Sequence, residues 1–317
     1  MNAIISTALS KLHGGIKASR VAQALARDVI RKSVLTTPPF DPFIIAKNLK
    51  LTITYAEIAA EAVLKDFDSD NPQIILAGSS VDYLGLGIRR RINFTVAHEI
   101  GHFAIRKAVS GFVPMSAFAS EHEDEERLCN EFASELLMPW RCISQSLGSH
   151  ELSPRSILKI ADEYDVSLTA LLTRAAKLWF PHFRAILWRR SKFGIRPHWA
   201  FPLNCTRAIL CDTGNTSVER AFQSEQEEIG TSDLLINGER FRWKCISFKT
   251  GVHPDTVLTI LYRSSLAARK LLPSARSKPN TVINVDTLNA LAVQQVLPFP
   301  EKRTMHAARR RRDRKRT

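Results

Sequence analysis

The sequence has 317 residues with an ordinary globular composition, 44% hydrophobic and 24% charged. This length exceeds a usual single domain, so it predicts two compact units or one large unit with appendages, and it argues against a fibrous or disordered protein. No apolar run approaches the roughly 20 residues that span a bilayer, which argues against an integral membrane protein. The first twelve residues are too polar for a secretory signal, so we expect a cytoplasmic protein.

The formal net charge of +14 is concentrated at the C-terminus, where residues 302–317 contain nine Lys and Arg against one Asp. The run at 309–316 repels itself and offers no apolar residues to bury, so we expect residues 296–317 to form a basic disordered tail. Such a tail can bind nucleic acid phosphates without sequence specificity, or it can act only as a solubilising segment.

The five cysteines are an odd number, and none forms a C-x-x-C pair. The sequence therefore indicates neither a disulfide framework nor a cysteine zinc knuckle, and we expect ordinary thiols. They are Cys129, Cys142, Cys205, Cys211 and Cys245.

The N-terminal part shows helical spacing over residues 3–33, and the prolines within 36–42 end it. We expect an N-terminal helical segment at 1–40. Three short β-type runs follow, and a turn-rich stretch separates the last two. They are 51–55, 62–64 and 73–77, and they predict a small antiparallel sheet, although short apolar runs also occur in buried helices.

Helical spacing returns at Asn93, with Val96 and Ile100 on one stripe and His98 and His102 on another. Histidines at i and i+4 lie one turn apart on the same face, where both reach one ion at about 2.0 to 2.1 Å. The motif His98-Glu99-Ile100-Gly101-His102 is therefore a candidate zinc site. A solvent-facing helix with two histidines is the alternative, and the apolar stripe argues against it.

Glu99 follows the first candidate ligand, where a carboxylate can take a proton from water at the metal. A catalytic zinc also needs a third protein ligand and an open position. The extended motif H-E-x-x-H-x-x-G-x-x-H fails here, because Ile105 replaces its glycine and Ala108 its last histidine. The third ligand must come from another segment.

A second helix, with an acidic start at 121–126, supplies candidates for that ligand. Glu126 and Asn130 lie one turn apart, as a ligand and a group that orients a histidine would. We favour Glu126, while Glu125 stays open because it lies nearer the apolar stripe that should face the core. His122 is a weaker candidate. We place the zinc peptidase core at 41–150.

The remaining chain divides into two predicted parts. Residues 151–182 contain two short helices joined at 164–167, a helix-turn-helix-like outline that is weak evidence for DNA binding. From 183 to 295, β-type runs such as 183–188 and 257–262 predict a second, smaller α+β domain of unknown role.

The segments 91–102 and 126–139 resemble the ImmA/IrrE family of metallo-endopeptidases. That family shows an R-x-x-F-T-x-A-H-E-x-G-H helix and an E-x-x-A-N-x-F-A-x-x-L-L-M-P helix. The resemblance covers roughly residues 40–180, and the main departure is Cys129 in place of alanine.

The resemblance implies an α+β, zincin-like fold with one Zn²⁺ per chain on His98, His102 and Glu126, and with Glu99 as general base. It also implies an endopeptidase that cleaves a helix-turn-helix transcriptional repressor. A competing hypothesis is a DNA-associated regulator with a structural or silent zinc site. A further hypothesis, compatible with the first, is a sensor whose C-terminal domain gates the peptidase.

Overall fold

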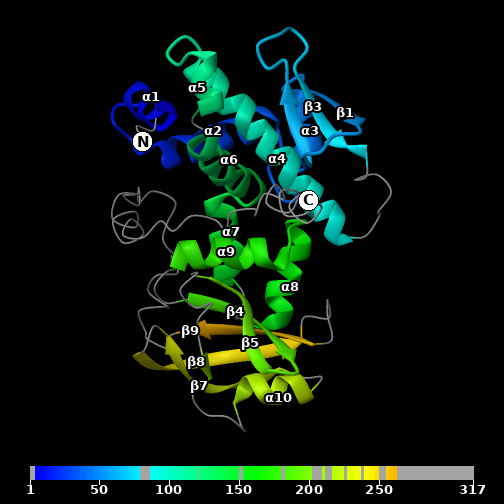
Figure 1. Cartoon of the computed structure of the whole chain (residues 1–317), viewed down its shortest axis with the longest axis vertical. Helices are drawn as coiled ribbons and strands as arrows, with labels where there is room; N and C mark the ends of the chain where they lie inside the picture. Colours follow the sequence, from blue (N-terminus) through cyan, green and yellow to red (C-terminus); the bar gives the residue numbers. More distant parts are fainter. Residues whose placement is uncertain are drawn as a thin grey trace, which may run out of the picture.

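The computed structural model describes ten stretches of the chain, and Figure 1 shows how they are arranged. These stretches are 4–78, 86–120, 122–149, 153–179, 183–201, 209–210, 216–224, 227–236, 239–249 and 255–262. Helices and a small sheet form one part, and a larger sheet forms the other, so the fold is α+β as predicted. The predicted basic tail at 296–317 lies outside the described residues. No described helix combines the length and the apolar character needed to cross a membrane.

The N-terminal segment consists of two helices, α1 (Ile4–Leu12) and α2 (Ala18–Lys32). The chain breaks between them at Gly14 and Gly15, which both have positive φ, a conformation that glycine adopts without strain. The next helix, α3 (Pro42–Asn48), begins where Asp41 accepts hydrogen bonds from two backbone amides. The predicted domain boundary near residue 40 stays a prediction.

The small sheet has the strand order β1-β3-β2, with β1 (Thr52–Ala56), β2 (Ala62–Lys65) and β3 (Gln73–Ala77). Strands β2 and β3 form an antiparallel hairpin, but β1 pairs with β3 in parallel. The prediction of a wholly antiparallel sheet was therefore wrong for β1. The most buried strand, β3, takes the centre, and β1 and β2 run in opposite directions on its two sides.

Helices α4 to α7 build the region around the histidine motif. Helix α4 (Leu86–Val109) starts seven residues before the predicted start at Asn93. It is followed by α5 (Met115–Ser120), α6 (His122–Leu137) and α7 (Trp140–Ser149). Neither α5 nor α7 was predicted from the sequence.

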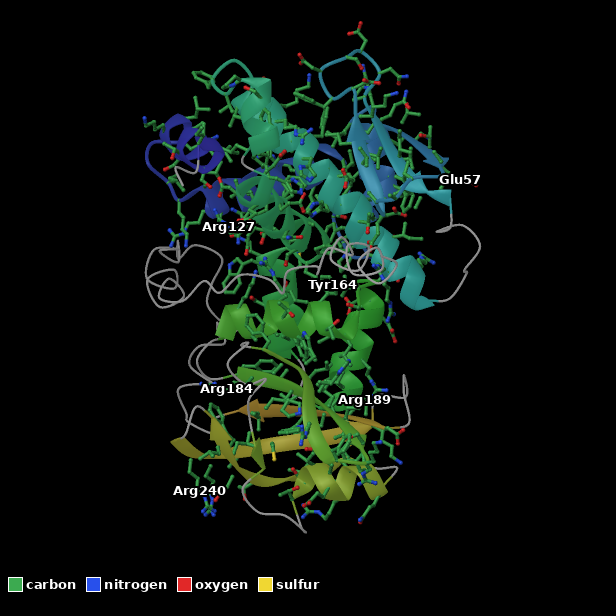
Figure 2. All side chains as sticks on the ribbon, in the orientation of Figure 1. Glu57, Arg127, Tyr164, Arg184, Arg189 and Arg240 are labelled. Carbon is green, nitrogen blue, oxygen red and sulfur yellow. The ribbon has the colours of Figure 1, made fainter. Side chains whose placement is uncertain are left out.

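The helix-turn-helix-like outline is present as α8 (Pro154–Glu163) and α9 (Leu168–Trp179). Tyr164 lies at the end of α8, near the junction of the two parts, and Asp165 turns the chain with a positive φ (Figure 2). Arg174 and Lys177 of α9 reach back to carboxylates of α6. Helix α9 therefore lies between α6 and the larger sheet.

The larger sheet has six strands, and every adjacent pair is antiparallel. Its order is β5-β4-β9-β8-β7-β6. The strands are β4 (Phe183–Ser191), β5 (Gly194–Phe201), β6 (Ile209–Leu210), β7 (Glu228–Ile236), β8 (Glu239–Lys249) and β9 (Thr256–Tyr262). The predicted β-type runs at 183–188 and 257–262 are confirmed as β4 and most of β9.

Both faces of this sheet are covered. Alternate residues of β9 enter different cores, as the period of two in a strand requires. Leu258 and Ile260 join the core that includes α9, whereas Val257 and Leu261 join a smaller core with α10 (Ser217–Gln223). The sheet therefore shares a hydrophobic core with the helical part, while the domain boundary at 183 stays a prediction.

Candidate metal centre

Helices α4 and α6 approach each other closely at Gly101. A Cβ atom placed on Gly101 would lie 3.2 Å from Cα of Cys129 and 3.2 Å from Cδ1 of Phe132. Such contacts are tighter than most in packed proteins, so a side chain here would push the neighbouring atoms of α6 away by a few tenths of an ångström. The glycine inside the histidine motif thus lets the two helices meet beside His98 and His102.

The two motif histidines lie within the packed interior. The side chains of His98 and His102 are 13% and 7% exposed, and their ring centroids are 4.9 Å apart. Val96 and Ile100 of the same helix are fully buried. The structure therefore confirms the packed helix and excludes the solvent-facing alternative.

The carboxylate of Glu126, on α6, contacts both histidine rings. Its Oε2 atom lies 3.2 Å from Nε2 of His98, and its Oε1 atom lies 3.1 Å from Nε2 of His102. The carboxylate is 35% exposed, so this side of the group faces solvent. The structure thus brings together His98, His102 and Glu126, although their role as metal ligands stays a prediction.

The opposite ring nitrogens have partners of their own on α6. Nδ1 of His98 lies 3.1 Å from Oδ1 of Asn130, and Nδ1 of His102 lies 2.8 Å from Oε1 of Glu125. Both partners are hydrogen-bond acceptors in these orientations, so each Nδ1 donates its proton. When a ring is neutral, its lone pair therefore lies on Nε2, the atom that faces Glu126.

Glu125 has a different place from the one expected of a ligand. It is completely buried, and its carboxylate also accepts hydrogen bonds from Nε and Nη2 of Arg106, at 2.6 and 3.1 Å. The argument from the apolar stripe that Glu125 faces the interior was right. Glu125 lies at Nδ1 of His102, where it orients the ring. The role of Arg106 could not be recognised from its position in the sequence.

His122, the weaker candidate, lies at the edge of the group. Its side chain is 71% exposed, and its Nδ1 atom is 3.8 Å from Oε1 of Glu126. An exposed side chain at this distance contributes little to holding an ion.

The donor set fits a zinc ion. Two imidazole lone pairs and a carboxylate that face one another repel unless a cation lies among them. Two histidines and one glutamate are also a known ligand set of catalytic zinc. His98, His102 and Glu126 are therefore the residues that would hold it.

The electrostatics of the group agree with this reading. Burial acts to lower the pKa of His102, but its contacts with Cys129, Glu125 and Glu126 hold that pKa well above its ordinary value. Burial acts to raise the pKa of Glu126, but hydrogen bonds with His102 and His98 hold it far below its ordinary value. Both shifts show that the group stabilises a positive charge beside a carboxylate.

Cys129 is the member of the group that the sequence did not identify as functional. Its Sγ atom and the ring nitrogens of His98 and His102 all lie within 4.8 Å of one another, in an arrangement that can hold a metal ion. Burial raises the pKa of the thiol to about 11, so it is neutral in this structure. The signal in the sequence was the position of Cys129 three residues after Glu126, which places both on one face of α6.

Glu99, the predicted general base, is buried, with 7% exposure. Within the described stretches it forms no hydrogen bond or ion pair, so its carboxylate is not committed to a structural partner. Its place next to His98 is compatible with the predicted role, which stays a prediction.

The candidate centre lies in a part of the chain that matches a known family model. Residues 46–176 match the family model of the IrrE N-terminal-like domain, a peptidase family, and the match includes every residue of the candidate centre. No curated protein matches the sequence. Among solved structures, a Mycobacterium tuberculosis transcriptional regulator is similar, with 16% identity and a TM-score of 0.45, over 80% of this chain and 78% of that chain.

Proposed function

Residues 46–176 are an IrrE N-terminal-like, metallopeptidase-like domain, and from this premise we propose that the protein is a zinc-dependent endopeptidase. One observation carries the proposal. The Nε2 atoms of His98 and His102 both contact the carboxylate of Glu126, while both Nδ1 atoms contact other side chains of α6. Rings oriented in this way are prepared to bind a metal.

His98, His102 and Glu126 hold one zinc ion per chain in this proposal. Three protein ligands leave one position of a tetrahedral site for water or substrate. Zinc, when bound, supplies a Lewis acid that polarises a carbonyl and lowers the pKa of water toward neutrality. Asn130 and Glu125 keep the rings in the tautomer that presents Nε2.

Glu99 performs the proton transfers. It takes a proton from the attacking water and later delivers it to the leaving amine, so one carboxylate serves as base and then as acid. Its burial keeps bulk water from competing for that proton.

We further propose that the substrate is a helix-turn-helix transcriptional repressor, whose cleavage relieves repression in the cytoplasm. The support is the resemblance of segments 91–102 and 126–139 to the ImmA/IrrE endopeptidases. The basic residues of 302–317 supply a nonspecific nucleic acid contact that keeps the enzyme near repressor bound to DNA.

The test combines metal content with cleavage. Elemental analysis should find about one zinc per chain in the wild type, and none in His102→Ala or Glu126→Ala. Glu99→Gln should keep the zinc but lose cleavage of a synthetic peptide library read by mass spectrometry. Glu123→Gln, which changes an exposed carboxylate on α6, is the control and should behave like the wild type. Unchanged cleavage by Glu99→Gln would refute the mechanism.

The competing function is a DNA-associated regulator with a structural or silent zinc site. Helix α9 gives it little support, because Arg174 and Lys177 bind carboxylates of α6 and the helix packs against the sheet. DNA contact would then depend on the tail. Zinc without cleavage, together with salt-dependent DNA binding that removal of 302–317 abolishes, would favour this function over the peptidase.

A further inference from the structure

Cys129 lies on the face of α6 that is turned toward the two histidines, and it is completely buried. Its Sγ atom lies within 4.8 Å of a ring nitrogen of His98 and of His102. Donor atoms at 2.0 to 2.3 Å from a tetrahedral ion lie about 3.3 to 3.8 Å from one another. Side-chain movements of about 1 Å would therefore bring the sulfur into coordination distance.

We infer that Cys129 is a fourth protein donor to the metal held by His98, His102 and Glu126. This inference rests on the proposed function, because it concerns the same ion. It replaces a three-ligand site by one with two imidazoles, a carboxylate and a thiolate. The thiol proton leaves to solvent when the sulfur binds the metal, as with any cysteine ligand.

The packing of the helices holds the backbone of Cys129 beside the two histidines. Gly101 lets α4 approach the backbone of Cys129 so closely that a Cβ atom there would be 3.2 Å from Cα of Cys129. The thiol side chain starts from the crossing point of the two helices, one turn along α6 from Glu126. The partly exposed Glu126 lies toward solvent, and the buried Cys129 lies toward the interior.

The orientation of the rings supports the same conclusion. Asn130 and Glu125 occupy the Nδ1 atoms of His98 and His102, so neither Nδ1 is available to the thiol. Only the Nε2 side of each ring remains, which is the side that Glu126 contacts. A buried cysteine often serves only as a small apolar residue, but two imidazoles beside it create a site for a metal ion.

The consequence is a site with two states. Four protein donors close a tetrahedral zinc site, whereas three leave a position for substrate. Bound Cys129 therefore silences the centre, and withdrawal of its sulfur opens it. The thiol thus regulates the same site that the proposed peptidase uses.

Cobalt substitution of the full-length protein tests the thiolate directly. Co²⁺ reports histidine and carboxylate ligands through visible bands, and it reports thiolate through an additional sulfur-to-cobalt charge-transfer band in the near ultraviolet. We expect both features in the wild type. Cys129→Ala should keep the visible bands and lose the charge-transfer band, and Cys142→Ala, a half-buried cysteine on α7, should keep both.

A visible spectrum without a charge-transfer band in the wild type would overturn this inference and leave the histidine site intact. No cobalt binding by the wild type would overturn the inference together with the proposed zinc site. Zinc affinity supplies a second measurement. Loss of a partner that merely orients a ligand costs about 10- to 100-fold, so loss of a direct donor should cost at least about tenfold. Equal zinc affinity of Cys129→Ala and wild type would also refute the inference.

Discussion

Glu125 binds His102 and Arg106 with the same carboxylate, through contacts of 2.8 Å to Nδ1 of His102 and 2.6 Å to Nε of Arg106. Glu125→Gln keeps the shape of this side chain but removes the charge that holds the ring and the guanidinium. We expect a loss of about 10- to 100-fold in zinc affinity, as for other residues that orient a metal-binding histidine. Competition with a chromophoric chelator measures it.

The matched control is Glu123→Gln, which removes an exposed carboxylate two residues earlier on α6. Its zinc affinity should equal that of the wild type. Equal affinities for the two variants would show that Glu125 has no part in orienting the ring.

Arg174 of α9 and Glu135 of α6 form an ion pair whose side chains are 3% and 0% exposed. Arg174→Met leaves the Glu135 carboxylate with only the half-exposed Arg27 and a backbone amide as partners. Because a buried charge is then poorly compensated, we expect a loss of about 3 to 5 kcal/mol in the free energy of unfolding. Urea denaturation followed by circular dichroism measures it.

Arg127→Met is the control for this pair, because Arg127 binds Asp124 on the same helix but is 35% exposed. That substitution should cost less than about 1 kcal/mol. A loss of the same size in both variants would contradict the role of the buried pair in holding α9 against α6.

Gly101→Ala places a methyl group 3.2 Å from Cα of Cys129 and from Cδ1 of Phe132. The two helices must move apart, which should destabilise the protein by about 1 to 3 kcal/mol and weaken zinc binding. Gly78→Ala is the control, since its Cβ would meet its nearest neighbour, the Ala56 carbonyl oxygen, at an ordinary 3.6 Å. Wild-type zinc affinity and thermal stability of Gly101→Ala would show that close approach is not required.

Tyr164 lies at the end of α8, where its hydroxyl is 3.0 Å from Oγ of Ser146. Burial raises the pKa of Tyr164 to about 12, from an ordinary value of 10. The unfolded chain therefore loses this proton first, so stability that is fully present below pH 10 is lost as the pH rises through 12. The free energy of unfolding falls by about 2 to 3 kcal/mol over this pH range.

Chemical denaturation at several alkaline pH values tests this. The free energy of unfolding of the wild type should fall more steeply above pH 10 than that of Tyr164→Phe, which lacks the ionisable group. Parallel curves for the two proteins would rule out a contribution from Tyr164.

Local features of the fold were predictable because they depend on neighbours in sequence. The spacing of His98 and His102 places them on one helix face in any packed helix, and the hairpin of β2 and β3 follows from the turn between them. The direction of β1 was not predictable. It depends on which strand takes the centre of the sheet, which is decided by burial of Ile74 and Leu76 in the whole structure.

In the candidate site too, features set by spacing along one helix were predictable, and features set by packing between helices were not. The sequence placed Glu125 and Glu126 near the histidines, but their roles depend on the rotation of α6 about its axis relative to α4. That rotation turns Glu126 toward Nε2 and Glu125 toward Nδ1 of His102. The spacing of three residues places Cys129 and Glu126 on one face of α6, but the distance from Cys129 to the histidines depends on the close approach of α4 and α6 at Gly101.

Helix α6 is enclosed on several sides, by α4, by α2 and by α9, and nine of its sixteen residues are buried. Local opening of α6 would break its packing against all three of these helices. Hydrogen exchange there should therefore require opening of the whole helical part, and these amides should be the slowest in the protein to exchange. The α6 side chains that contact His98 and His102 would then lie on the segment that unfolds last.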